Sequence, residues 1–245
     1  MRDTSIDYGI RAFAANSARS PLVAGTCGVR VVLLTLVLAA GGCGVSVDGD
    51  ASHKINGAVH VEAGKPPGSA ETVNGSIHVD PNATVTQAAT VNGSIQVGAH
   101  ATAGSVKTVN GTITLEDGVK VAGSVESVNG SLTLHEGADV GGALQNVAGR
   151  IELRGAHVGG GIRTVTGDIS ILGASRVEGG VVVQKPGSSS ILVSDIPRIV
   201  IGPGAAVQGD LRFEREVHLY VSDKATVGPV SGATAVTYSG DSPPG

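Results

Sequence analysis

Two histidines, His60 and His78, lie at matching places in consecutive copies of a repeated motif. Imidazole serves both as a general acid or base and as a ligand of transition metals. Later copies of the motif hold Gln96, Thr114 and Thr133 at the same place, which is typical of a solvent-facing position. No third ligand is evident beside the two histidines, so the sequence predicts neither a metal site nor a catalytic histidine.

A second group of residues that could bind or cleave a ligand consists of Arg150, Glu152, Arg163 and Asp168. Carboxylates, alone or with arginine, bind and cleave polysaccharides. We treat the four as a candidate ligand patch, although a solvated surface that lowers aggregation explains them more simply. Glycine pairs recur at the corners of the repeat rather than in a phosphate-binding loop. The sequence therefore predicts no catalytic residue, no metal and no cofactor.

The N-terminal segment carries a different kind of chemistry, centred on Cys43. The apolar run from residue 31 to residue 40 is shorter than the roughly 20 residues that span a bilayer, and its length fits a signal peptide. It leads into Ala39-Ala-Gly-Gly-Cys43, which resembles the lipobox of bacterial lipoproteins, with Ala40 where leucine is commoner. The resemblance implies that Cys43 is lipidated and becomes the mature N-terminus. Gly44 in place of aspartate favours the outer membrane.

The domain boundaries follow from these features. Residues 1–42 are expected to be a leader. Its first 28 residues are unusually long for a leader and carry Asp3 and Asp7 among the arginines, which points to an internal start near Val29. Residues 43–54 would form a lipidated tether, residues 55–230 a repeat domain and residues 231–245 a flexible tail.

The repeat that must position these side chains is a Val-Asn-Gly-Ser-Ile motif, as at residues 73–77. Its glycines recur at nearly constant intervals along the chain. Asn-Gly favours positive φ and therefore sharp turns. If the turns stack, asparagine amides can hydrogen-bond along the stack. The predicted corner ladder comprises Asn56, Gly57, Asn74, Gly75, Asn92, Gly93, Asn110, Gly111, Asn129, Gly130, Gly149 and Gly167.

Aliphatic residues recur about every six positions between the corners, as at Val79, Val85, Val91 and Val97. Self-similarity at a fixed period of about 18 residues indicates a repeat architecture. Three short strands and three turns per repeat predict an all-β, single-stranded triangular β-solenoid (β-helix) of about nine coils. In this interpretation the valine before each Asn-Gly points inward. The pattern does not distinguish a left-handed from a right-handed solenoid.

Composition agrees with a narrow β-architecture. The 245 residues include 38 Gly, 2 Phe and no Trp, so the core must consist of small branched side chains. The net charge is −4, and no basic stripe is present to neutralise phosphates, which excludes a nucleic-acid partner.

Tandem Val-Asn-Gly-Ser-Ile segments look like those of uncharacterised bacterial β-strand-repeat proteins of the cell envelope. The segments Val121-Ala-Gly-Ser-Val125 and Val140-Gly-Gly-Ala-Leu144 are also similar to bactofilins, which form polymers from a small β-helix. That resemblance implies end-to-end assembly without nucleotide. The lipobox departs from bactofilins, which are cytoskeletal. Hexapeptide acyltransferases share the coil length, but they need a catalytic histidine and cofactor contacts.

Taken together, the sequence favours a non-enzymatic lipoprotein of the bacterial envelope that acts as a scaffold, assembly or interaction module. Its expected partners are the membrane, through Cys43, and further copies of itself or an envelope protein. The alternative is a protein that binds or processes carbohydrate along the outer faces of the solenoid, which are rich in Ser, Thr, Arg and Glu.

Overall fold

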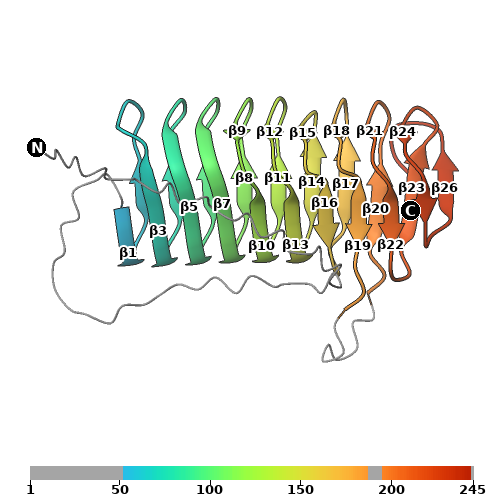
Figure 1. The fold of residues 1–245 in the computed structure, drawn as a ribbon, viewed down its shortest axis with the longest axis horizontal. Helices are drawn as coiled ribbons and strands as arrows, with labels where there is room; N and C mark the ends of the chain where they lie inside the picture. Colours follow the sequence, from blue (N-terminus) through green and yellow to red (C-terminus); the bar gives the residue numbers. More distant parts are fainter. Residues whose placement is uncertain (1–51, 187–194, 244–245) are drawn as a thin grey trace, which may run out of the picture. The chain divides into compact units, whose positions relative to one another are not determined.

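A computed structural model describes residues 52–186 and 195–243, which contain 26 β-strands and no helix (Figure 1). These residues belong to one compact unit, Ser46–Gly245. No helix that is long and apolar enough to cross a membrane is found within these described ranges. Every strand pairing is parallel, and successive partners lie about one coil apart in the sequence, as Ile77 and Ile95 do.

One sheet provides one strand per coil and therefore counts the coils. Its order is that of the chain, which means that each coil packs directly on the one before it. The ten strands are β2 (Val59–Val61), β4 (Ile77–Val79), β6 (Ile95–Val97), β8 (Ile113–Leu115), β11 (Leu132–Leu134), β14 (Ile151–Arg154), β17 (Ile169–Leu172), β20 (Arg198–Ile201), β23 (His218–Ser222) and β26 (Ala235–Tyr238).

The second sheet has 16 strands and provides the rest of each coil. Its first strands are long: β1 (Ser52–Asn56), β3 (Gly68–Asn74), β5 (Thr84–Asn92) and β7 (Thr102–Asn110). From β7 onward it divides into two columns. One contains β9 (Lys120–Val121), β12 (Asp139–Val140), β15 (His157–Val158), β18 (Arg176–Val177), β21 (Ala206–Val207) and β24 (Thr226–Val227); the other contains β10 (Val125–Asn129), β13 (Leu144–Ala148), β16 (Ile162–Thr164), β19 (Val181–Val183), β22 (Leu211–Phe213) and β25 (Val230–Ser231).

The predicted β-solenoid is thus confirmed, with about ten coils rather than nine. The extra strand is β26, which lies in the segment expected to be a tail and pairs with β23 over four residues. Its alternating sequence Ala-Val-Thr-Tyr suits a strand, and the ring of Tyr238 is buried. At the other end, β1 begins within the predicted tether.

One coil is longer than the others. Thr164 pairs with Val183, and Val183 in turn pairs with Phe213, so the second step along the chain is much longer than the first. The additional residues fall between β19 and β20. Residues 187–194, which fall within this stretch, lie outside the described residues. The stack continues in register beyond the insertion, because Ile171 pairs with Ile201.

The core is a column of aliphatic side chains that runs the length of the unit. Two inward positions per strand of the ten-stranded sheet supply most of its volume, such as Ile113 and Leu115 of β8, both fully buried. Phe213 is the only phenylalanine in this core among the described residues. A solenoid interior only one coil wide leaves little space for aromatic rings, which agrees with the composition.

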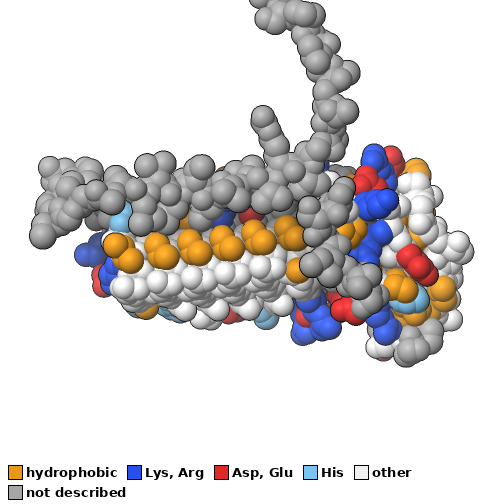
Figure 2. Space-filling model, turned by 90° about the horizontal axis from the view of Figure 1, so that it is seen from below, with side chains coloured by type: hydrophobic (Ala, Val, Ile, Leu, Met, Phe, Trp, Pro, Cys, Tyr) orange, Lys and Arg blue, Asp and Glu red, His pale blue; other side chains and the backbone are white. Residues whose placement is uncertain are grey.

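The inward orientation predicted for the valine of each Val-Asn-Gly corner is wrong. The residue before it is buried instead: Thr72, Thr90, Thr108, Ser127, Asn146 and Thr164. Side chains alternate between the two faces of a strand, so the valines lie half-exposed on the surface, aligned with Ile55, which is 68% exposed. Figure 2 shows an evenly spaced row of hydrophobic side chains on one face, as this column requires.

Candidate functional site

The Val-Asn-Gly corner is built from three hydrogen-bonded columns. The Nδ2 groups of Asn74, Asn92, Asn110 and Asn129 each donate to Oδ1 of the preceding asparagine at 2.9–3.2 Å. The amide nitrogen of Gly75 donates to the carbonyl oxygen of Asn92 in the next coil. The hydroxyl of Thr90 donates to the carbonyl oxygen of Gly75 at 3.0 Å. Thr72 and Thr108 make the same contact with the carbonyl oxygens of Gly57 and Gly93, so these buried threonines satisfy carbonyl groups and the corner is structural.

Close packing explains the glycines of this corner. A Cβ atom on Gly93 or Gly130 would lie 1.9 Å from the carbonyl oxygen of the glycine one coil earlier. The same test at Gly149 and Gly167 gives 2.3 and 2.2 Å. No side chain fits at these distances, so from Gly75 to Gly167 the column excludes every residue except glycine. Asparagine is not required, because Ala148 takes its place opposite Asn129.

The four residues of the predicted ligand patch do not converge. Arg150 and Asp168 flank the same corner in adjacent coils, and Glu152 lies in β14, whereas Arg163 lies in β16 of the other sheet. Within the described residues no hydrogen bond or ion pair joins any two of them. Glu152 instead binds Arg154, with Nε–Oε1 of 2.6 Å. Asp168 accepts the backbone N–H of Arg198 at 2.9 Å.

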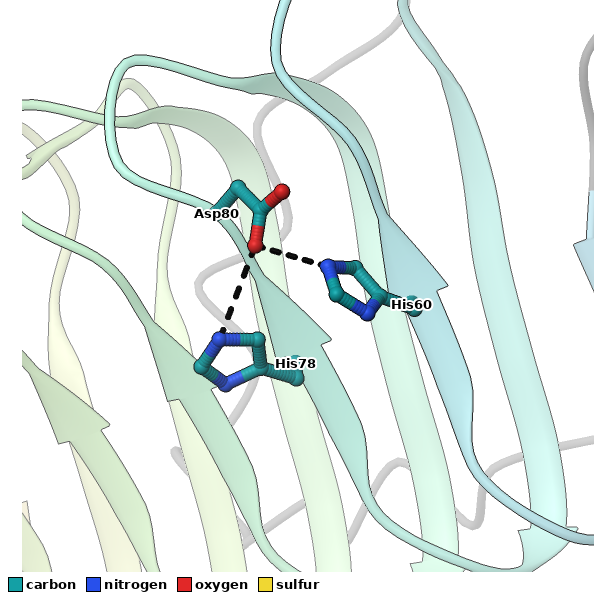
Figure 3. A group of neighbouring side chains, drawn as sticks. All are labelled: His60, His78 and Asp80. Carbon is teal, nitrogen blue, oxygen red and sulfur yellow. Dashed lines mark hydrogen bonds and ion pairs between the residues drawn. The ribbon is translucent and has the colours of Figure 1, made fainter.

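The two histidines singled out in the sequence do come together, and they bring a third group with them (Figure 3). His60 and His78 are paired directly between β2 and β4, and their rings meet edge to face with centroids 5.3 Å apart. Oδ1 of Asp80 lies 2.7 Å from Nε2 of His60 and 3.7 Å from Nε2 of His78. One ligand atom from each residue lies within 4.8 Å of the others.

Asp80 was not identified from the sequence as a partner of the histidines. The signal was present, because Asp80 is two residues after His78 and alternate residues of a strand share a face. The side chains of His60, His78 and Asp80 are 58%, 46% and 30% exposed, so the group is open to solvent. A cavity of about 280 Å³ borders His60 and is lined by Glu62, Lys65, Pro66, Gly68 and Ser69.

A second histidine group lies in the middle of the solenoid. Nδ1 of His157 is 2.7 Å from Oδ1 of Asp139 in the preceding coil, and Nε2 is 3.3 Å from Oε1 of Glu178 in the following coil. The hydrogen bond with Asp139 raises the pKa of His157 above its ordinary value of 6.5; partial burial opposes this and Glu178 supports it. Because the two carboxylates engage opposite ring nitrogens, this group is an ion-pair ladder and not a chelating site.

Both ends of the solenoid leave strand edges without a neighbour among the described residues. β1 and β2 end the two sheets at one end, and β24, β25 and β26 end the columns at the other. Apolar side chains are exposed at these ends, with Val236 49% and Val230 37% exposed. Unpaired edges with apolar side chains are templates for pairing with another chain.

The predicted lipidation site, Cys43, lies outside the described residues. No protein-family model, no curated protein and no solved structure matches the chain.

Proposed function

We propose that the chain is a non-enzymatic scaffold of the bacterial cell envelope, anchored to the membrane at Cys43 and extended by association of its solenoid ends. The observation that carries the proposal is the state of the two ends. Ile55 at the first coil and Val236 at the last are exposed on strands that lie at the edges of their sheets.

The physical argument is that a solenoid end is an unfinished interface. Each inner coil hydrogen-bonds to a coil on both sides, whereas a terminal coil has no such neighbour on its outer side within the described part of the chain. Stability in a stack of this kind resides in interfaces between neighbours. An end that meets another end therefore gains the same type of interface that holds the coils together, and head-to-tail contacts between copies produce open filaments.

Assembly is tested with the full-length chain carrying Cys43→Ser, so that lipidation cannot contribute. Sedimentation velocity over a wide concentration range should reveal a series of oligomers, and electron microscopy of the same sample should show filaments. Val236→Lys places a charge on the terminal strand and should reduce association. Ser94→Lys places the same charge at an exposed position beside β6, in an inner coil, and should have no effect.

A strict monomer at all concentrations would contradict assembly through the ends. Equal association of the Val236→Lys and Ser94→Lys variants would show that another surface is responsible.

Anchoring is tested separately by expressing the full-length chain in a Gram-negative host supplied with labelled fatty acid. The unsubstituted chain and Cys27→Ser should incorporate label, and Cys43→Ser should not. Label in the Cys43→Ser variant, or none in the unsubstituted chain, would remove the membrane anchor from the proposal.

A further inference from the structure

The group formed by His60, His78 and Asp80 has the composition of a transition-metal site (Figure 3). Two imidazoles and one carboxylate suit ions of intermediate softness, such as Zn²⁺ and Cu²⁺. Zinc sites with three protein ligands keep a fourth position for water or a further ligand. We infer that these three residues bind one divalent transition-metal ion, with Zn²⁺ as the reference case, at the first two coils of the solenoid.

The distances fit this inference. In a tetrahedral site with metal–nitrogen bonds of about 2.0–2.1 Å, ligand atoms lie roughly 3.3 Å apart. The structure has 2.7 Å and 3.7 Å between Asp80 Oδ1 and the two Nε2 atoms, and all three ligand atoms lie within 4.8 Å. Changes of about 0.4–1.5 Å in these separations would bring the three atoms to the required geometry, and side-chain rotation can supply them.

The strands hold the ligands in place before any ion binds. His60 and His78 are register partners in parallel strands, whose separation of about 4.8 Å is fixed by the backbone ladder. Asp80 follows β4 directly, and its backbone N–H donates to the carbonyl oxygen of Val61 at 2.9 Å. The three ligands are thus tied to two adjacent strands, which lowers the entropy that binding must remove.

The next coils show the contrasting arrangement. At the corresponding places Gln96 donates to Glu116 at 3.0 Å, which is the same cross-coil contact as that of His60 with Asp80. An amide–carboxylate pair links two coils without offering a nitrogen ligand. The first two coils differ because they carry imidazoles at both successive positions, which a simple link between coils does not need.

Solvent access is also suited to an ion with an open coordination position. The cavity of about 280 Å³ that borders His60 includes the carboxylate of Glu62 and the amine of Lys65, which lie 3.9 Å apart. The side chains of His60, His78 and Asp80 are themselves 58%, 46% and 30% exposed, so water can reach an ion held between them.

The test uses the full-length chain with Cys27→Ser and Cys43→Ser, since free thiolates also bind zinc. Titration with ZnCl₂ in a calorimeter, in competition with a chromophoric chelator, should show one site per chain. His78→Ala and Asp80→Asn should lose this site. His135→Ala and His157→Ala should retain it, and His157 is the sharper control because it also contacts two carboxylates.

A second measurement separates binding from misfolding. ZnCl₂ should raise the thermal unfolding midpoint of the parent chain, because a ligand that binds only the folded state stabilises it. The midpoint of His78→Ala should not respond, while its circular dichroism spectrum without zinc matches that of the parent. No stoichiometric binding by the parent, or unchanged binding by both His78→Ala and Asp80→Asn, would overturn the inference.

Discussion

Two of the corners in each coil use glycine for different reasons. At the Val-Asn-Gly corner, the glycines are packed so closely that a Cβ atom would approach the carbonyl oxygen of the previous coil to 1.9–2.3 Å. At the corner between β4 and β5 and its counterparts, φ lies between 58° and 71°. The residues there are Asn82, His100, Gly118, Gly137, Gly155 and Gly173. The first corner is limited by space from Gly75 to Gly167, with a positive φ as well at Gly57 and Gly149, whereas the second is limited by backbone conformation.

The residue types found at each corner along the coils agree with this difference. Asparagine and histidine occupy the second corner in two coils, and asparagine is the residue that most readily joins glycine in the left-handed region. The first corner keeps its glycine from residue 75 to residue 167, even where asparagine has given way to Ala148. A glycine column in a solenoid can therefore reflect close backbone contact, positive φ or both, as at Gly149, and the substitutions that it tolerates help to distinguish them.

The side chains beside the corners also differ. The Val-Asn-Gly corner carries a ladder of neutral amides. The strands after the second corner carry a column of charges, in which Lys120, Asp139, His157 and Arg176 are successive register partners. We expect the first ladder to be insensitive to pH and the second to respond to it.

The largest effect is expected at the glycines. Gly130→Ala should destabilise the solenoid by more than about 2 kcal/mol, since backbone must move to admit the Cβ atom. At roughly 2–4 °C per kcal/mol for a chain of this size, the thermal midpoint should fall by at least about 4–8 °C. Gly137→Asn should change it little, because the nearest atoms would lie 3.6 Å from the new Cβ and Asn82 occupies an equivalent place. Equal losses in the two variants would erase the distinction between the corners.

The next effect concerns the buried hydroxyls of the first corner. Thr108→Val removes a donor to the carbonyl oxygen of Gly93 at 3.2 Å and should cost about 1 kcal/mol. Ser127→Ala is the matched control, because the buried Oγ of Ser127 has no hydrogen-bond partner among the described residues. That substitution should be neutral or stabilising in thermal unfolding. A larger loss for Ser127→Ala than for Thr108→Val would show that these hydroxyls do not act through the glycine carbonyls.

A smaller effect is expected from the amide ladder. Asn92→Ala removes hydrogen bonds to Asn74 and Asn110, but both are exposed to water, so we expect a loss of about 0.5–1 kcal/mol. The reverse change, Ala148→Asn, extends the ladder by one coil and should raise the thermal midpoint slightly. If Asn92→Ala lowered the thermal midpoint as much as Gly130→Ala, the asparagine amide would contribute as much to the stability of the corner as the glycine.

The smallest effect is the pH response of the second corner. The pKa of His157 is raised in the folded chain, first by Asp139, and Lys120, Arg176 and Glu178 are the other charges of this face. The stabilisation is therefore fully present below the ordinary value of 6.5 and is lost as pH rises through the folded pKa.

His157→Gln should accordingly lower the thermal midpoint relative to the parent at acidic pH, with a difference that shrinks above neutrality. NMR titration of the His157 ring checks the pKa directly. Asn92→Ala should show no such trend, and a downward shift of the His157 pKa would contradict the assigned sign.

The sequence predicted the solenoid because every coil repeats the same turn chemistry, so each copy supports the interpretation of the others. It failed at a finer level. The residues before the corner read Thr-Val-Asn-Gly, and hydrophobicity alone favours the valine as the inward side chain. Threonine lies inside because its hydroxyl reaches a glycine carbonyl, and that acceptor belongs to another coil. Such a contact is invisible until the coils are stacked.

The histidine group was half-recognised for a related reason. The spacing of His60 and His78 predicted that they lie together. Asp80 follows the last residue of β4, so its shared face with His78 becomes apparent only if the alternation of side chains continues beyond the end of the strand. The tail was misjudged because β26 has no Asn-Gly signal, and only its pairing with β23 shows that it belongs to the stack.

The parallel pairing of all coils has a mechanical consequence. Hydrogen bonds between coils point along the length of the stack, so tension applied at the two ends acts on them directly instead of shearing strands past one another. The chain should then yield one coil at a time from an end. Each coil would release roughly 60 Å of extended chain at about 3.3–3.6 Å per residue. A protein held at one end would thus extend in nearly equal steps, except at the longer coil between the register partners Val183 and Phe213.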